Sequence, residues 1–211
     1  CMSALSDNSI ISKVITYRFP GDRYGKDEEL VGHKLGNLIM VGMRDVTGNF
    51  ENAISLFKKT FNISGNFFPA TATPVSISAK TTEGNRVERE ENIDLGRYFG
   101  KKALDMVYLN PKNPKPAPGV IESLKKADII IAGPGDLYTT ILPTLIVPSI
   151  YKEKNRSKKR KVFIINVANK PVETKGYKVS DYINAIKKHL GAFPFDKVII
   201  AGWVTDEDLP A

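Results

Sequence analysis

A glycine-rich turn, Gly133-Pro134-Gly135, carries the residues whose types and spacing best suit chemistry. It follows the apolar run 129–132 and leads into small hydroxyl residues and a second apolar segment, an order typical of a buried parallel strand that enters a helix. Amide groups at a helix start, together with the helix dipole, favour a phosphate there. The two glycines let the backbone approach an anion closely, and Thr139 and Thr140 add hydroxyl donors.

Asp136 directly follows this turn and can cap the helix or hold a hydrated magnesium ion. A plain strand-to-helix turn, whose glycines serve only the backbone geometry, is the alternative to a phosphate site. A single glycine-rich turn does not separate these two interpretations. The turn by itself therefore leaves both open.

His33 and His189 are the two histidines of the sequence. His33 can contact a phosphate or carry a proton near neutral pH, or it is a surface or capping histidine. His189 lies among lysines near a predicted helix end, where we expect it to interact with the helix dipole. With Cys1 as the single cysteine, these residues cannot form a zinc site or a Cys-His nucleophile pair. A Ser-His-Asp triad stays open, although no Gly-x-Ser-x-Gly motif supports it.

Composition is that of a globular protein, with 211 residues, 42% of them hydrophobic and 26% charged. The net charge is +8, and most of the excess lies in a basic run over 152–161 that has no interleaved aromatic residues. We expect this run to be a solvated loop, and we expect neither a nucleic acid nor a membrane as partner. The longest apolar stretch, 141–150, is too short to cross a bilayer, and the start of the sequence has no secretory pattern. With one cysteine, these features predict a cytoplasmic protein.

Hydrophobic periodicity predicts the elements that position these residues. A first helix capped by Ser6 and Asp7, a second over 36–46 and a third capped by Asn49 are expected within 1–62. The apolar residues expected to be buried are Ile10, Ile11, Val14 and Ile15 in the first helix and Ala53, Ile54, Phe57 and Phe61 in the third. From 66 to 110 the period is two, which predicts a hairpin with a turn at 83–85 and one solvated face, then a strand over 104–109.

Residues 129–201 alternate between strand and helix patterns. Strands are predicted over 129–132, 162–167 and 198–201, and helices over 139–150 and 180–190, the latter with Ser180 as N-cap and Gly191 as its end. Such alternation predicts a parallel sheet with both faces covered. Ligands bind beyond the carboxyl ends of these strands, at 133–140, 166–174 and 202–203. We predict a single α/β domain over 1–211, with 67–110 as a β-hairpin excursion within it.

Five segments stand out in order along the chain: YRF at 17–19, GHKLGN at 32–37, FPATATPVSISA at 68–79, AGPGDLYTTILPTLIVPSI at 132–150 and INVANKPVETKGYKVSDYI at 165–183. Together they resemble the gluconeogenesis-factor family, bacterial proteins related to 2-phospho-L-lactate transferase. The resemblance implies a Rossmann-like three-layer parallel sheet whose strand ends hold a nucleotide-diphosphate ligand. The residues that it implies along the phosphates are Gly133, Gly135, Leu137, Tyr138 and Thr139. Those implied to face the same crevice are His33, Asn37, Asn166 and Thr174.

Two functions are compatible with this resemblance. The first is a regulatory protein that binds a nucleotide-diphosphate sugar and is linked to cell shape and cell-wall growth on gluconeogenic carbon sources. The second is a magnesium-dependent enzyme, similar to 2-phospho-L-lactate transferase, that acts on a nucleotide-diphosphate-linked donor. Asp136 is then the candidate ligand for Mg²⁺, through water, as well as a ligand-binding candidate. The partner in either case is a phosphorylated small molecule, and a homo-oligomer is left open.

Three departures from the family pattern stand out. Asp136 takes the place of a small hydroxyl residue, and a carboxylate beside a diphosphate repels it unless a cation intervenes. Residues 168–172 read Ala-Asn-Lys-Pro-Val where the family usually has Met-Thr-Gln-Pro-Gly, so Lys170 can offset phosphate charge. The first strand and glycine-rich loop of the family have no counterpart here, so we interpret the chain as a fragment that lacks the N-terminal strands.

Overall fold

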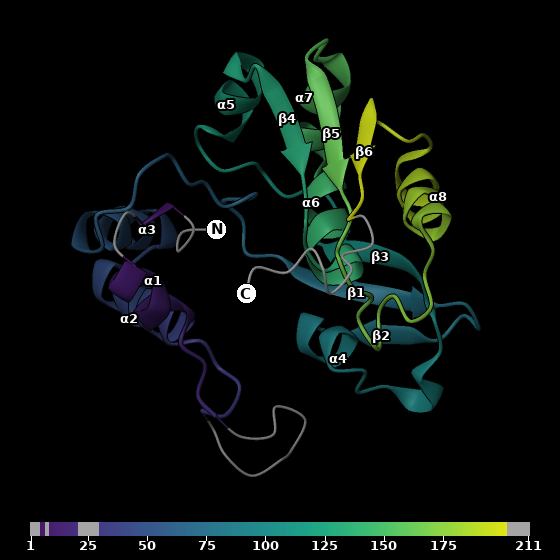
Figure 1. Cartoon of the computed structure of the whole chain (residues 1–211), viewed down its shortest axis with the longest axis horizontal. Coiled ribbons are helices and arrows are strands. Elements are labelled where there is room, and N and C mark those ends of the chain that lie inside the picture. Colours follow the sequence, from purple (N-terminus) through teal and green to yellow (C-terminus); the bar gives the residue numbers. More distant parts are fainter. Residues whose placement is uncertain (1–4, 7–8, 21–29, 202–211) are drawn as a thin grey trace, which may run out of the picture. The chain divides into compact units, whose positions relative to one another are not determined.

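The computed structural model describes residues 5–6, 9–20 and 30–201 of the chain (Figure 1). Its contacts divide the chain into two compact units, residues 1–68 and residues 69–211, and each is described by itself below. The prediction that residues 1–211 form one domain stays a prediction. Within the described residues, no helix has both the length and the apolar character that a membrane span requires.

Three α-helices lie within the described residues of the first unit. They are α1 (Ser9–Thr16), α2 (Leu35–Thr47) and α3 (Phe50–Thr60). The cap predicted for α3 is confirmed, because the side chain of Asn49 accepts a hydrogen bond of 2.8 Å from the amide of Asn52. Ala53, Ile54 and Phe57 of α3 are buried, as predicted.

The apolar stripe predicted for α1 is only partly correct. Ile15 is buried, whereas Ile10 and Val14 are exposed. The reason is the close approach of α2, which covers one side of α1 at Gly36: a Cβ there would lie 2.7 Å from Cγ2 of Ile15. Asp7, half of the predicted cap of α1, lies outside the described residues, and Ser6 pairs with Ile63 in an isolated bridge.

An antiparallel sheet opens the second unit. It consists of β1 (Ser76–Thr81), β2 (Arg86–Glu88) and β3 (Leu104–Asn110) in the order β2-β1-β3. The predicted hairpin and the strand after it are confirmed, with Ala79 opposite Val87 on one side and Val107 on the other. The short helix α4 (Glu90–Asp94) and the 3-10 turn η2 (Phe99–Lys101) lie between β2 and β3.

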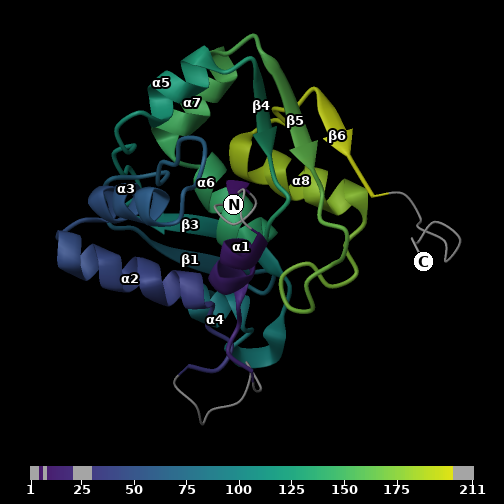
Figure 2. The same cartoon turned by 60° about the vertical axis from the view of Figure 1, so that its left-hand side comes forward.

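A parallel sheet follows, which confirms the predicted α/β class. Its strands are β4 (Ile129–Ala132), β5 (Arg160–Ile164) and β6 (Lys197–Ile199), in the order β4-β5-β6. Its helical segments are α5 (Val120–Lys126), the π-helical turn η3 (Leu137–Ile141), α6 (Leu142–Leu145), α7 (Pro148–Arg156) and α8 (Val179–Leu190). The carboxyl ends of β4 and β5 point toward the antiparallel sheet (Figures 1 and 2).

One face of the parallel sheet holds the core of the second unit. Phe163 of β5 belongs to the same buried cluster as Leu142 of α6 and Ile186 of α8. Side chains alternate between the faces of a strand, so Ile131 and Ile199 point the other way and remain 54% and 51% exposed. Coverage of both faces, as predicted from the strand-helix alternation, is therefore incomplete among the described residues.

Three local predictions in this unit were wrong. The basic run is not a loop, because its first half belongs to α7 and its last two residues begin β5. The segment 139–150 is three helical pieces rather than one, since Pro148 lacks an amide hydrogen and begins a new helix. Ser180 is not the N-cap of α8, because the Asp181 carboxylate accepts a 2.7 Å hydrogen bond from the amide of Lys178 and the helix begins one residue earlier. Gly191 ends that helix in a left-handed conformation, as predicted.

Candidate functional site

The Gly-Pro-Gly turn lies directly after β4 and packs against the end of β5. A Cβ at Gly133 would lie 2.3 Å from the carbonyl oxygen of Ile164, so the approach of the turn to β5 requires a glycine. The amide of Gly135 donates a 2.8 Å hydrogen bond to Oδ1 of Asn166, which follows β5. The structure thus brings together two of the predicted site residues, Gly135 and Asn166, at neighbouring strand ends.

A carboxylate of the protein occupies the start of the helical segment after this turn. Glu173 accepts a 2.9 Å hydrogen bond from the amide of Tyr138 and a 2.8 Å hydrogen bond from the hydroxyl of Thr139. It is fully buried, and the helix dipole favours a negative charge at this position. Part of the donor set predicted to hold a phosphate is therefore engaged by Glu173. Glu173 was not among the site residues predicted from the sequence, although it lies next to the predicted site residue Thr174.

Other predicted site residues make their contacts inside the protein. The side chains of Leu137 and Tyr138 are buried, and the Tyr138 hydroxyl bonds the carbonyl oxygen of Leu104 and the hydroxyl of Tyr177. Burial raises the pKa of the Tyr138 hydroxyl, and the hydrogen bond with Tyr177 raises it further by a smaller amount. The hydroxyl oxygen of Thr174 accepts a 2.9 Å hydrogen bond from the amide of Lys170. Ligand contacts by these residues stay predictions.

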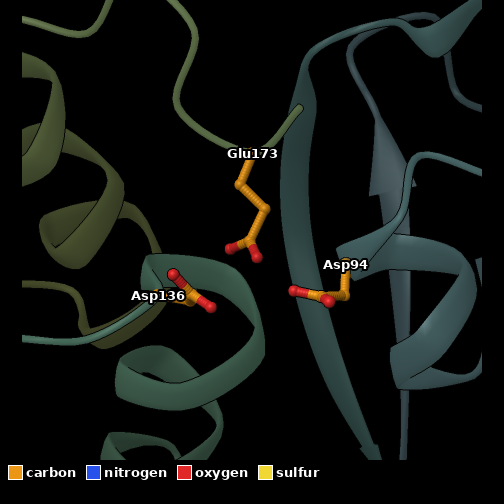
Figure 3. Close-up of side chains that lie close together, drawn as sticks. All are labelled: Asp94, Asp136 and Glu173. Atoms are coloured by element: carbon orange, nitrogen blue, oxygen red, sulfur yellow. The ribbon is translucent and has the colours of Figure 1, made fainter. Parts of the chain in front are cut away.

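Three carboxylates converge beside the turn. Asp94 at the end of α4, Asp136 before η3, and Glu173 point toward one another from three separate segments (Figure 3). One oxygen of each lies within 4.8 Å of the others, and we call this set the acidic trio. Asp94 and Glu173 are buried, whereas the side chain of Asp136 is partly exposed.

Lys170 lies among these carboxylates. Its Nζ donates to Asp94, to Oδ2 of Asp136 at 2.7 Å and to Oε1 of Glu173 at 3.1 Å. Asp136 and Lys170 are two of the positions at which the sequence departs from the pattern of the resembled family, and they form an ion pair with each other. Lys170 was predicted to offset the charge of a phosphate, and in the structure it offsets the charge of carboxylates.

The trio has the donor chemistry of a magnesium site, because Mg²⁺ prefers carboxylate oxygen ligands. The ammonium of Lys170 nevertheless lies within hydrogen-bond distance of the same carboxylates, with distances of 2.7 Å to Asp136 and 3.1 Å to Glu173. The residues in this arrangement therefore do not fit a divalent ion among them. Binding of magnesium by Asp136 through water stays a prediction.

A cavity of about 660 Å³ lies at the carboxyl ends of β5 and β6. The polar residues of the lining are Asn166, Asn169, Tyr177, Lys178 and Tyr182. The apolar lining includes Ile165, Val167, Val179 and Ile200. Asn166 lies in the wall of this cavity and also bonds Gly135, so the cavity adjoins the Gly-Pro-Gly turn. Sequence reasoning placed a ligand at this edge of the sheet but did not identify Lys178 or the two tyrosines as part of its lining.

Hydrogen bonds fix the ring orientation of part of this lining. The Tyr182 hydroxyl donates to Oδ1 of Asn169 at 3.0 Å, and the Asn169 side-chain amide donates to the carbonyl oxygen of Tyr177 at 2.9 Å. The rings of Tyr177 and Tyr182 pack edge to face, with 5.6 Å between their centroids. The aromatic wall is thus held in place before any ligand binds, which lowers the entropy that binding costs.

His33 and Asn37 belong to the first unit, at the loop before α2 and in its first turn. The carbonyl oxygen of His33 accepts a hydrogen bond from the amide of Phe19, and Arg18 pairs with Lys34 across the same bridge. A contact of His33 or Asn37 with the Gly-Pro-Gly turn stays a prediction. The third predicted strand end, 202–203, lies outside the described residues.

His189 does not act as the charged partner of a helix dipole, contrary to our expectation. Its Nε2 accepts a 2.9 Å hydrogen bond from the amide of Val107, and its Nδ1 lies 2.7 Å from the carbonyl oxygen of Ala185. This pair of bonds requires a neutral ring with the proton on Nδ1. Burial lowers the pKa of His189, which agrees with that assignment. His189 therefore joins α8 to β3 and has no ring nitrogen left for proton transfer.

The fold and the site define a parallel α/β protein with a cavity at the strand ends, beside a glycine-rich turn. Residues 1–210 match the family described as 2-phospho-L-lactate transferase CofD, and the chain belongs to this family. It fits the gluconeogenesis factors within it. It is 35% identical to the gluconeogenesis factor of Bacillus subtilis, over 99% of this chain and 62% of that protein. It is 38% identical to that of Halalkalibacterium halodurans, over 85% and 55%.

Solved structures agree with this assignment. A crystal structure of a Bacillus halodurans protein matches 97% of this chain and 64% of that chain, with a TM-score of 0.81 and 35% identity. A second crystal structure of a protein from this organism gives a TM-score of 0.80. These likenesses confirm the Rossmann-like fold class. The chain spans 55–62% of the length of the two curated relatives named above.

Proposed function

We propose that this protein binds a nucleotide-diphosphate sugar as a regulatory protein of the gluconeogenesis-factor type, linked to cell shape and cell-wall growth on gluconeogenic carbon sources. The observation that carries the proposal is the position of Asn166. Its side chain accepts the 2.8 Å hydrogen bond from Gly135 and lies in the wall of the cavity. A ligand in this cavity would therefore adjoin the glycine-rich turn at the carboxyl ends of parallel strands, where such sheets bind nucleotides.

The size and chemistry of the cavity support this class of ligand. Its volume of about 660 Å³ is within the range of small-molecule sites. Tyr177 offers aromatic surface for a base or sugar, with the buried ring of Tyr182 packed against it, and the side-chain amide of Asn166 offers hydrogen bonds to a polar edge. Lys178 offers a positive charge for a phosphate.

The alternative is a magnesium-dependent enzyme, similar to 2-phospho-L-lactate transferase, that acts on a nucleotide-diphosphate-linked donor. The donor chemistry of the acidic trio is its support, because carboxylates are the ligands of the Mg²⁺ that would neutralise phosphate charge in such a transfer. The contacts of Lys170 with the trio and the engagement of both ring nitrogens of His189 favour the regulatory protein over this enzyme.

Calorimetric titration of the intact protein with uridine- and guanosine-diphosphate ligands, with and without Mg²⁺, tests the proposal. Uridine-diphosphate-sugar binding without Mg²⁺ and without product is the expected result. Magnesium-dependent product formation would favour the enzyme and contradict the regulatory role. Absence of nucleotide binding, together with strongly salt-dependent RNA binding, would contradict both.

Two variants test the site itself. Lys178→Ala should weaken nucleotide binding about tenfold or more, because it removes a charge-assisted hydrogen bond from the cavity wall. Lys187→Ala is the matched control, since Lys187 is an exposed lysine of the same helix α8 that does not line the cavity. Equal affinities of the two variants would refute the proposed site.

A further inference from the structure

We propose that the ammonium of Lys170 is the resident cation of the acidic trio and takes the place of a divalent metal ion there. As a consequence, the nucleotide site works without a metal in the trio. The second statement rests on the proposed function, whereas the occupancy of the trio can be tested without any nucleotide.

The contacts of Lys170 are those of a fixed counter-ion. A lysine ammonium has three N–H donors, and the Nζ of Lys170 donates to three different carboxylates. Its side chain is 16% exposed, and those of Asp94 and Glu173 are 7% and 0% exposed. Carboxylates buried to this degree need a cation beside them, because the cost of removing unpaired charges from water is large. Lys170 provides that charge from within the chain.

The backbone of Lys170 is held in place independently of these ion pairs. Its amide donates to the Thr174 hydroxyl at 2.9 Å, and its carbonyl oxygen accepts from the amide of Thr174 at 3.1 Å. The turn over 170–174 therefore holds the backbone of Lys170 beside the trio. Glu173, in the same turn, also accepts hydrogen bonds from Tyr138 and Thr139.

A divalent ion and the ammonium cannot share this place. Mg²⁺ requires oxygen ligands at about 2.0–2.1 Å in an octahedral arrangement, so bound metal would lie between the same oxygens that Lys170 contacts. The like charges of metal and ammonium would also repel each other at that distance. Lys170 therefore competes with any metal ion in the trio, and because it is part of the chain its effective concentration is always high.

As a consequence, the Gly-Pro-Gly turn is positioned by side chains of the protein, without a bound metal ion. Asp136 lies between Gly135 and η3, so the Lys170–Asp136 ion pair ties the start of η3 to the 170–174 turn. Asp94 ties the same lysine to the end of α4. Lys170 is thus a positioning residue for the Gly-Pro-Gly turn, in a role that a bound metal would otherwise have.

Manganese binding to the intact protein, followed by electron paramagnetic resonance, tests the occupancy of the trio. Mn²⁺ is the probe because it accepts the same oxygen ligands as Mg²⁺. The wild-type protein should bind no Mn²⁺ in the trio, and Lys170→Met should gain one site that is at least about tenfold tighter than any site of the wild type. Lys175→Met, an exposed lysine of the same loop, is the matched control and should behave as the wild type.

The location of the new site is checked by adding Glu173→Gln to Lys170→Met, which should abolish the gained binding. If Lys170→Met does not fold alone, recovery of its near-ultraviolet circular dichroism on addition of Mn²⁺ supports the same conclusion. A wild-type Mn²⁺ site that disappears in Asp136→Asn would overturn the proposal. So would a Lys170→Met protein that Mn²⁺ neither binds nor restores.

Nucleotide binding in the presence of a chelator tests the second statement separately. The wild-type affinity for a uridine-diphosphate sugar should be unchanged by EDTA. Binding that EDTA abolishes would contradict metal independence. Absence of nucleotide binding under both conditions would contradict the proposed function and leave the Mn²⁺ result for the trio standing.

Discussion

Replacing Lys154 by methionine should stabilise the protein at neutral pH. Lys154 lies in the last turn of α7, only 1% exposed. Its Nζ is the one buried side-chain nitrogen or oxygen without a hydrogen-bond partner among the described residues. The rings of Tyr151 and Phe195 lie 5.3 Å and 5.4 Å from it and give partial compensation through cation–π attraction. A buried charge with this little compensation costs folding free energy.

The size of the effect follows from the pKa of this amine. Burial, with a smaller contribution from the nearby Lys161, lowers the pKa of Lys154 from 10.5 to about 8. That fall corresponds to a penalty of about 3 kcal/mol in the free energy of unfolding at pH 7. Methionine has a similar length and no charge, but it loses the cation–π attraction, worth about 1–2 kcal/mol in total. We therefore expect Lys154→Met to be about 1–2 kcal/mol more stable at pH 7.

The pH dependence gives this prediction a second, sharper signature. Between about pH 8 and 10.5 the folded state has lost the Lys154 proton and the unfolded state has kept it. The stability of the wild type therefore rises through that window relative to the variant, and the gap between them closes. Urea unfolding followed by circular dichroism at several pH values between 7 and 10.5 measures the gap directly.

The exposed Lys152 of the same helix provides the control. Lys152→Met should change the free energy of unfolding by no more than about 0.5 kcal/mol at any of these pH values, because it is a surface substitution. A Lys154→Met protein that is no more stable than the wild type at pH 7 would refute the reasoning. A stability gap that stays constant up to pH 10 would refute it equally, because the charge would then not be its cause.

Two further predictions concern His189 and Gly133. Burial holds the pKa of His189 below 6.5, so its contribution to stability is complete above that pH and is lost as the pH falls below it; His189→Gln should flatten this dependence in acid unfolding curves. Gly133→Ala should destabilise the protein by more than about 3 kcal/mol in urea unfolding, because its φ is +87° and the new Cβ would meet the backbone of Ile164 at 2.3 Å.

One experimental result would contradict each of these two predictions. Equal slopes of stability against pH below 6.5 in the wild type and His189→Gln would show that another group titrates there. For Gly133, the control is Gly176→Ala, whose φ is +73° with no heavy atom within 4 Å of the new Cβ. It should cost only the conformational strain, about 1–2 kcal/mol. If the two alanine variants lose the same stability, the contact with β5 does not require a glycine.

Local sequence patterns were sufficient for most of the secondary structure. The Asn49 cap, the hairpin turn at 83–85, the strand over 129–132 and the end of α8 at Gly191 were all predicted correctly. Each depends on residues within a few positions of one another, such as a side chain that bonds the amide three residues later. The basic run 152–161 was wrongly predicted to be a loop, because nearly all of its residues are charged and show no apolar helical periodicity. Its first half is nevertheless helical, and Lys154 in that half is buried.

The glycine-rich turn, the strand end at 166 and the α/β alternation were determined by the sequence alone, because strand ends and tight turns have local signatures. The hydrogen bond that joins Gly135 to Asn166 was seen only in the tertiary structure. The partners of Lys170 were decided only by the tertiary structure. Asp94 lies 76 residues from Lys170 and Asp136 lies 34 residues from it, and no local pattern indicates that folding brings them together. Whether a charge is solvated, paired or buried depends on which distant segments surround it, and this decided the roles of Lys154, Lys170 and Glu173.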